Sequence, residues 1–267
     1  KYETFYSNGA KEWIYNYANG YKNGDYQKFN PEGVLIDEGS YIDGIYNGVR
    51  KTYYDSGLPK EILHYQKGAK MGKNLTYYES GELMWEENYT KITKDGVLRE
   101  YYRSGQLKTE QIYIDGKKSK TWKTYYPDGT ISSETPHDAG AVNGLIKFYD
   151  QQGNLDRTVP YKYGRNTGTA TTYFTNGDKH TETTFLNGAK SGLYYEYYPS
   201  GAIKIKGNHL YDVRQGKWTY YNEKGEITKT ETYSRGKLIS SSGSEITLVY
   251  IVVQKFVITD DMIVVIQ

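Results

Sequence analysis

The side chains best suited to acid–base chemistry include a periodic set of glutamates. Glu86, Glu110 and Glu134 follow one another at intervals of 24 residues, and Glu182 keeps the same phase. Two carboxylates can act as general acid and general base when a substrate fits between them. If each interval is a pair of neighbouring strands, successive glutamates lie about 9 to 10 Å apart along an open sheet. We therefore interpret them as a solvated row of charges.

The four histidines do not suggest a catalytic centre either. His137 and His209 occupy a column that is otherwise filled by Tyr or Phe, which predicts a packing role, and His64 and His180 stand singly in different units. The chain has no cysteine, which excludes disulfides, thiolate metal sites and cysteine nucleophiles. It contains no H-E-x-x-H, P-loop or nucleophile-elbow motif. The sequence predicts no catalytic, cofactor-binding or metal site, and hence a protein that is not an enzyme.

The charge is balanced, with 34 basic and 32 acidic residues and a formal net charge of +2. A balance of this kind gives no overall field that attracts nucleic acid or anionic lipid, so nucleic acid is disfavoured as a partner. One column of loop residues would nevertheless line a long edge with positive charge, and lipid contact through these lysines is a weaker alternative. The column consists of Lys22, Lys70, Lys94, Lys118, Lys190 and Arg214.

An internal repeat covers most of the 267 residues. Each unit of 24 residues has a turn glycine, an aromatic residue four positions before it and another ring eight positions after it. The position two residues after the glycine is usually aliphatic. Ten such units fill residues 1–240. Their turn glycines are Gly9, Gly33, Gly57, Gly81, Gly105, Gly129, Gly153, Gly177, Gly201 and Gly225.

Each unit is predicted to be a β-hairpin, because 24 residues are too few for a βαβ crossover and show no helical period. Joined hairpins make an all-β, elongated antiparallel meander of about twenty strands, which strand twist should wind into a curved ribbon. Tyrosine is abundant, with 32 residues, and its hydroxyl needs a partner when the ring is buried. The core should therefore be aromatic and partly polar.

Turn chemistry predicts which side chains share a face. The segment 126–129, Tyr-Pro-Asp-Gly, suits a type I turn followed by a left-handed glycine, which is a three-residue loop. That loop pairs Tyr125 with Ile131, and the period-two alternation of a strand then places His137 on their side. The same alternation predicts a second, mostly polar face that carries Thr124, Ser132 and Glu134.

The pattern Tyr-Tyr-x-x-Gly-x-Leu, seen at 101–107 and followed by Tyr113 and Gly116, resembles the MORN repeat and more closely its bacterial variant. The resemblance covers all ten units. It implies an elongated ribbon of hairpins without catalytic activity, and a protein of the kind found as antitoxin-like partners or at the cell surface. Some units depart from the pattern and should have altered loops or weaker packing. Ile92, Asp212 and Lys120 replace loop glycines, and Lys11, Pro59 and Lys179 replace the aliphatic residue.

Residues 241–267 differ from the repeats. The run from Ser240 to Ser244 is a flexible linker by composition, and an apolar stretch follows that suggests strands at 246–258 and 262–266. This tail could cap the open edge of the sheet, begin a further domain, or add to another copy and assemble the chain end to end. The residues that would form the cap or assembly strand are Ile246, Leu248, Tyr250, Val252, Phe256 and Ile258.

Two functions follow from these observations. The first is a non-enzymatic scaffold that binds a protein partner, antitoxin-like or surface-bound, and the second is a secreted or surface subunit that assembles with itself. Secretion or the cell surface is favoured over the cytoplasm. On the predicted polar face, packing does not require the second tyrosine of each unit, so serine at these positions should abolish partner binding with little loss of stability. The predicted contact residues are Tyr54, Tyr78, Tyr102, Tyr126 and Tyr198.

Overall fold

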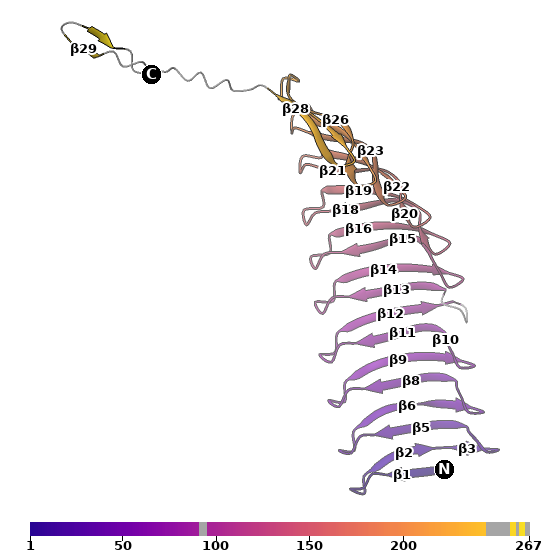
Figure 1. The fold of residues 1–267 in the computed structure, drawn as a ribbon. Coiled ribbons are helices and arrows are strands. Elements are labelled where there is room, and N and C mark those ends of the chain that lie inside the picture. The colour runs from indigo at the N-terminus through magenta and orange to yellow at the C-terminus, as the bar shows by residue number, and fades with distance from the viewer. Residues whose placement is uncertain (91–94, 244–256, 260–261, 265–267) are drawn as a thin grey trace.

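The computed structural model describes residues 1–90, 95–243, 257–259 and 262–264, and every regular element among them is a β-strand. Figure 1 shows hairpins stacked into one long ribbon whose strands rotate progressively toward β28. The strands of the ribbon form a single 26-stranded antiparallel sheet. The predicted all-β, elongated meander of hairpin repeats is confirmed.

Each unit contributes two long strands. The strand before the turn glycine is β1 (Tyr2–Phe5), β5 (Gly24–Phe29), β8 (Gly48–Tyr53), β11 (Gly72–Tyr77), β13 (Gly96–Tyr101), β15 (Lys117–Tyr125), β18 (Gly144–Tyr149), β21 (Gly168–Tyr173), β23 (Ala189–Tyr197) or β26 (Gly216–Tyr221). The strand after it is β2 (Lys11–Tyr15), β6 (Leu35–Ile42), β9 (Pro59–Gln66), β12 (Leu83–Tyr89), β14 (Leu107–Ile114), β16 (Ile131–Asp138), β19 (Leu155–Lys162), β22 (Lys179–Leu186), β24 (Ile203–Leu210) or β27 (Ile227–Ser234).

Short strands lie in the connections between units, and three more strands follow the last unit. The connecting strands are β3 (Tyr17–Ala18), β4 (Tyr21–Lys22), β7 (Ile45–Tyr46), β10 (Ala69–Lys70), β17 (Ala141–Val142), β20 (Arg165–Asn166) and β25 (Val213–Arg214). The strands after the last unit are β28 (Lys237–Gly243), β29 (Val257–Thr259) and β30 (Met262–Val264).

The turn inside each hairpin is the predicted three-residue loop. In the sixth unit the Gly129 N–H donates to Tyr126 O (2.9 Å) and the Tyr126 N–H donates to Thr130 O (2.8 Å). Gly129 has a φ of +91°, and Tyr125 pairs with Ile131. A type I turn closed by a left-handed glycine makes this geometry. Lys11, Pro59 and Lys179, which replace the aliphatic residue, keep the same pairing.

A β-bulge follows the turn, and it makes the predicted division of the faces wrong. Thr124 pairs with Ser133 and not with Ser132, so one residue is extra on the second strand. The Thr124 hydroxyl oxygen lies 2.7 Å from those of both Ser132 and Ser133. A bulge interrupts the period-two alternation, so residues beyond it change sides. His137 therefore lies on the face of Thr124, and Glu134 lies with Tyr125.

The buried side chains gather on one of these faces, here called the core face. It carries the positions five and seven residues before the turn glycine and those four, six and eight after it. Tyr26, Leu98 and Trp218 are buried there. Rings from the short connecting strands pack against them. For example, the ring centroids of Tyr46 and Tyr26 lie 6.0 Å apart. The opposite side, the outer face, carries the first tyrosine of each unit.

The connections between units are tight turns with two left-handed residues, and most also stack on one another. Asn187 and Gly188 have φ values of 51° and 96°, and the Gly188 N–H donates to Asn166 O (2.8 Å) of the preceding connection. Altered connections were expected at Asp212 and Lys120. Both instead adopt the left-handed conformation, with φ values of 68° and 56°. Ile92 lies outside the described residues.

We expect Lys120→Gly to stabilise the protein by about 0.5 to 1 kcal/mol, because a left-handed backbone is strained for any residue with a Cβ. Asp212→Gly is the matched control. It relieves the same strain but removes the hydrogen bond that Asp212 Oδ1 accepts from Lys190 N (2.8 Å), so it should bring no gain. Urea unfolding of the two variants measures the difference, and equal gains would contradict the role of the Asp212 carboxylate.

The Ser/Gly linker prediction is wrong for residues 240–243. They belong to β28, in which Thr230 pairs with Ser242 and their hydroxyl oxygens lie 2.6 Å apart. Serine composition indicates flexibility only where no strand edge is free, and β27 offers its edge here. Two short strands, β29 and β30, form a hairpin in the apolar tail. Of the predicted cap residues, Ile258 lies in β29, and Ile246, Leu248, Tyr250, Val252 and Phe256 lie outside the described residues.

Candidate functional site

The predicted contact tyrosines form a regular row along the turns, here called the tyrosine row. Each is half-buried, and each hydroxyl donates to a backbone carbonyl of the next unit, as Tyr102 does to Tyr125 O (2.8 Å). Packing therefore does require these residues, contrary to the sequence-based expectation. Their contact role stays a prediction. The row consists of the five predicted residues, Tyr54, Tyr78, Tyr102, Tyr126 and Tyr198, and of Tyr6, which was not predicted.

Three of the four units without a tyrosine at this position carry an acceptor side chain there, and the fourth carries Phe174. Asp150 Oδ1 accepts from the N–H groups of Gln152 (2.9 Å) and Asn154 (2.8 Å), and Asn222 accepts in the same way. Asn and Asp commonly hydrogen-bond the backbone two residues on. Asn or Asp at this position thus closes the turn, whereas tyrosine ties one unit to the next. Asn30 does both, because its Oδ1 accepts from Val34 N (2.8 Å) and its Nδ2 donates to Asp55 Oδ1 (3.2 Å) of the next unit.

We expect Tyr102→Phe to cost about 1 kcal/mol, because it leaves the Tyr125 carbonyl without this inter-unit hydrogen bond. Tyr102→Ser should cost more, because the ring is lost as well. Tyr163→Phe is the control, since Tyr163 is exposed and its hydroxyl has no partner among the described residues. Thermal unfolding measures all three. An unchanged melting temperature for Tyr102→Ser would show that packing does not require the tyrosine row.

The glutamate column is not a solvated row. These carboxylates lie half-buried on the outer face and are bonded to tyrosines, lysines and arginines. Glu182 accepts from Tyr197 OH (2.6 Å) and Lys179 Nζ (2.6 Å). Arg99 bridges Glu86 (3.5 Å) and Glu110 (2.8 Å) across neighbouring strands. The column therefore holds neighbouring units together electrostatically and offers no free acid–base pair.

The basic column does not line an edge with free charge. Lys22 Nζ lies 3.8 Å from the ring centroid of Tyr15, and Lys118 Nζ lies 4.6 Å from that of Trp122. Lys70 pairs with Glu87 (3.4 Å). Cations over aromatic faces are held by the ring quadrupole. The column instead covers the core face with its own cations, although Lys118 and Lys190 are exposed and Lys94 lies outside the described residues.

The densest group of this kind surrounds Glu231 on the core face. Its carboxylate accepts from Tyr220 OH (2.6 Å), Tyr233 OH (2.9 Å) and Lys229 Nζ (2.5 Å). The guanidinium of Arg214 lies 4.2 Å from the ring centroid of Trp218 and 3.5 Å from Glu231. The hydrogen bond from Lys229, with those from the two phenols, lowers the pKa of Glu231 to about 2.

Glu231 should make stability fall in acid. Its pKa is depressed from 4.5 in the folded state, so its contribution is present above that value and is lost as the pH falls toward 2. We expect the charge to contribute about 1 to 2 kcal/mol after solvent screening. Glu231→Gln should lower stability at neutral pH and flatten the acid limb, whereas Glu223→Gln should do neither. Urea unfolding across this pH range measures both, and an unchanged acid limb in Glu231→Gln would contradict the assignment.

The two histidines of the ring column pack as rings. His137 lies 4.4 Å from Trp122 and His209 lies 5.0 Å from Trp218, measured between ring centroids. Burial lowers the pKa of both, so they are neutral at physiological pH. Burial and neutrality suit a packing role and leave no imidazole aimed at a substrate here.

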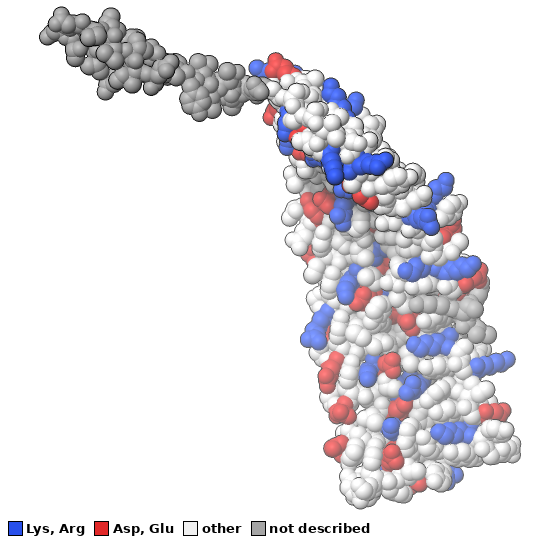
Figure 2. All heavy atoms as spheres, in the orientation of Figure 1, with Lys and Arg blue, Asp and Glu red and all other residues white. Residues whose placement is uncertain are grey.

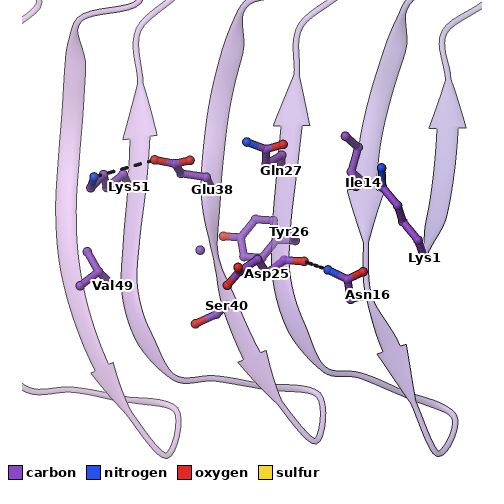
Figure 3. Close-up of a pocket in the computed structure, with 11 residues that line it drawn as sticks. Lys1, Ile14, Asn16, Asp25, Tyr26, Gln27, Glu38, Ser40, Val49 and Lys51 are labelled. Atoms are coloured by element: carbon purple, nitrogen blue, oxygen red, sulfur yellow. Dashed lines mark hydrogen bonds and ion pairs between the residues drawn. The ribbon is translucent and has the colours of Figure 1, made fainter.

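A shallow pocket of about 500 Å³ crosses the outer face near the N-terminus (Figure 3). It spans β2, β5, β6 and β8. Asn16 Nδ2 donates to Asp25 O (2.8 Å), and Lys51 lies 3.9 Å from Glu38. These groups can hydrogen-bond a ligand that crosses the strands. The residues that line the pocket include no histidine and no paired nucleophile and base.

Over the ranges that the structure describes, no three or more histidine or acidic side chains lie close enough to hold a metal ion. The same ranges hold no helix of the length and apolarity that a membrane crossing needs. Neither the bulge nor the Glu231 cluster was predicted from the sequence. A polar residue at a core position of a tyrosine-rich repeat is the only hint, because a buried phenol needs an acceptor.

The family described as MORN repeat variant matches residues 46–67, 94–115, 118–139, 142–163 and 190–210. No curated protein matches. A crystal structure of TcdB2-TccC3 is 13% identical, covers 90% of this chain and 15% of that chain, and has a TM-score of 0.20. A porin-like protein from Bacteroides uniformis is 10% identical over 73% of this chain and 92% of its own, with a TM-score of 0.19. This chain thus corresponds to about 15% of the length of the TcdB2-TccC3 chain. Likenesses this weak carry no argument about function.

Proposed function

Because this chain belongs to the MORN repeat variant family, whose repeats mediate contacts with proteins or membranes, we propose that it is a non-enzymatic scaffold that binds another protein. The observation that supports this function best is the open outer face of the ribbon. It is one face of a single 26-stranded sheet with no second layer among the described residues. Figure 2 shows charges of both signs spread over the visible side of the ribbon. A long surface with mixed charge suits recognition of a macromolecule better than enclosure of a small substrate.

Apolar side chains on the outer face strengthen this proposal. Ile42, Ile45 and Val49 are exposed in the second unit and its connection to the third, and Leu186, Leu193 and Leu210 are exposed near the other end. Clustered exposed apolar residues commonly mark protein-binding surfaces. Side chains buried on the core face cannot serve this purpose without unfolding the unit.

Site-specific photo-cross-linking tests the scaffold function. A photoreactive residue at Val49 or Leu193 should capture a protein from an extract of the source cell, whereas the same residue in place of the exposed Glu223, on the turn side, should not. Mass spectrometry identifies the captured chain, and capture must disappear when unlabelled protein competes. Equal capture at Glu223, or none at the outer-face positions, would contradict the proposal.

Two more specific functions, an antitoxin-like role and self-assembly, have less support than the general scaffold function. An antitoxin- or immunity-like role comes from the family resemblance, and its test is whether the captured partner is a toxin. Self-assembly through the C-terminal tail is the alternative. It predicts that the captured protein is a second copy of this chain and that deletion of residues 245–267 leaves a monomer in light scattering. A monomeric intact chain at high concentration would exclude the alternative.

A further inference from the structure

A small apolar patch interrupts a basic stretch on the outer face, beside the connections of the seventh to tenth units. Three columns meet there, at nine, twelve and sixteen residues after the turn glycine. The residues nine and twelve after the glycine pair directly, as Leu210 does with Val213. Leu193 lies on the next strand, where its neighbour Gly192 pairs with His209. The leucine patch, defined as Leu186, Leu193, Leu210 and Val213, is between 40% and 52% exposed.

Basic residues occupy the same columns on both sides of the leucine patch. Lys162 and Arg165 precede it in the seventh unit, and Lys217 and Lys237 follow it in the ninth and tenth. All four are exposed, and none forms an ion pair with a described residue. Glu182 is paired with Lys179. Asp212 accepts a hydrogen bond from the Lys190 N–H, which leaves its charge in place, but the four basic side chains outnumber it. The rim of the leucine patch therefore keeps an excess of positive charge.

The tips of the neighbouring connections give a second observation. Tyr163 and Tyr211 are each 72% exposed, and their φ values are 48° and 49°. A left-handed backbone is unfavourable for a bulky residue. Among the other described units the same tip is Asn or Asp in four and Lys67, Ala139 or Arg235 in three, so only these two tips carry a ring. Local structure gives no reason for a ring at these tips. Strained and exposed positions are often retained for contacts with a ligand.

From these observations we propose that the leucine patch and its basic rim bind an acidic protein segment with apolar side chains between its carboxylates. The apolar side chains would cover the leucines, and the carboxylates would pair with Lys162, Arg165 and Lys217. Units lie about 9 to 10 Å apart along the ribbon, so the rim spans about 30 Å, or about nine residues of extended peptide. This inference rests on the proposed scaffold function and names the chemistry of its partner.

The second unit provides a matched control on the same face. Ile42, Ile45 and Val49 occupy the same three columns and are equally exposed. Their neighbours in the preceding unit and at the tip are the carboxylates Asp25 and Asp43, and Lys73 of the following unit is paired with Glu86 (3.2 Å). An acidic segment should therefore avoid this second patch, which lacks both the free basic rim and the exposed tip tyrosines.

Fluorescence anisotropy with a labelled synthetic peptide tests the proposal on the full chain. The probe is about twelve residues long, with leucines in the middle and glutamates at both ends. We expect binding that weakens as salt is raised, and a Kd at least about tenfold higher in Leu186→Ser/Leu193→Ser/Leu210→Ser and in Lys162→Glu/Arg165→Glu/Lys217→Glu. Ile42→Ser/Ile45→Ser/Val49→Ser should bind as the parent does. Thermal unfolding checks that every variant remains folded.

Three results would overturn the proposal. They are equal binding of a peptide with lysines in place of the glutamates, unchanged binding by the leucine-patch variant, and patch-dependent binding of phosphatidylglycerol vesicles without binding of the peptide. The last result would assign the patch to a membrane surface. If photo-cross-links to a partner persist at Val49 while the peptide does not bind, only this inference fails and the scaffold function stands.

Discussion

Substitution of Gly207 by alanine should unfold the C-terminal part of the ribbon at much lower denaturant concentration. Gly207 pairs with Tyr194 in the sheet, and a Cβ at this position would overlap the indole of Trp218 on the adjacent strand. Trp218 is 1% exposed and is surrounded by the rings of Tyr194 and His209, so it cannot swing into solvent without opening the core face. Overpacking of this kind should cost about 3 kcal/mol or more.

Two controls separate overpacking from a general effect of alanine. Gly39 is in the same repeat position, but a Cβ there would meet Tyr26 at 3.1 Å and the Arg50 backbone at 3.3 Å, so Gly39→Ala should cost less. Trp218→Leu in the Gly207→Ala background should recover part of the loss, because the smaller side chain makes room. Urea unfolding followed by tryptophan fluorescence measures Gly207→Ala and Gly39→Ala. Circular dichroism follows the unfolding of the double variant, which lacks Trp218. Equal costs at Gly39 and Gly207 would contradict the role of the indole.

The repeat pattern predicts the fold well because each signal acts over a short distance. Proline and glycine at 127 and 129 determine the turn, and the turn determines that Tyr125 pairs with Ile131. Repetition then extends one hairpin into the ribbon. Left-handed backbone at Lys120 and Asp212 shows that the stacked connections impose their geometry even without glycine.

The division into faces could not be predicted in the same way. The bulge at Ser132 has no residue signature of its own, since Met84 and Lys108 occupy the same position in other units. One unpaired residue moves His137 and Glu134 to opposite faces from those expected. The roles of the lysines and of the tyrosine row depend on this division. The lysines were predicted to line an exposed edge and the tyrosines to be free for a partner, but both make contacts within the protein.

Asp37→Ala should cost as much as Gly207→Ala, through buried charge rather than volume. Arg50 donates to Asp37 through Nη2 (2.7 Å) and Nε (3.1 Å), and Tyr26 OH donates to the same carboxylate (2.8 Å). The side chains of Arg50 and Asp37 are 24% and 12% exposed. The hydrogen bond to Asp37 raises the pKa of Arg50. Without Asp37 that increase is lost, but the guanidinium still stays charged because arginine is ordinarily protonated far above neutral pH. An unpaired charge at such a site costs about 3 to 5 kcal/mol.

The matched variants show whether the ion pair itself stabilises the protein, or whether stability is lost only when one charge is left without its partner. Asp37→Ala with Arg50→Met removes both charges, so it should recover much of the loss, because an apolar replacement of a buried ion pair is often close to neutral. Glu3→Ala removes the solvent-screened contacts with Lys1 (2.9 Å) and Lys11 (3.5 Å) and should leave stability almost unchanged. Urea unfolding at neutral pH compares the three. If Asp37→Ala costs no more than Glu3→Ala, the guanidinium of Arg50 is hydrated, and the core face is open to water between the second and third units.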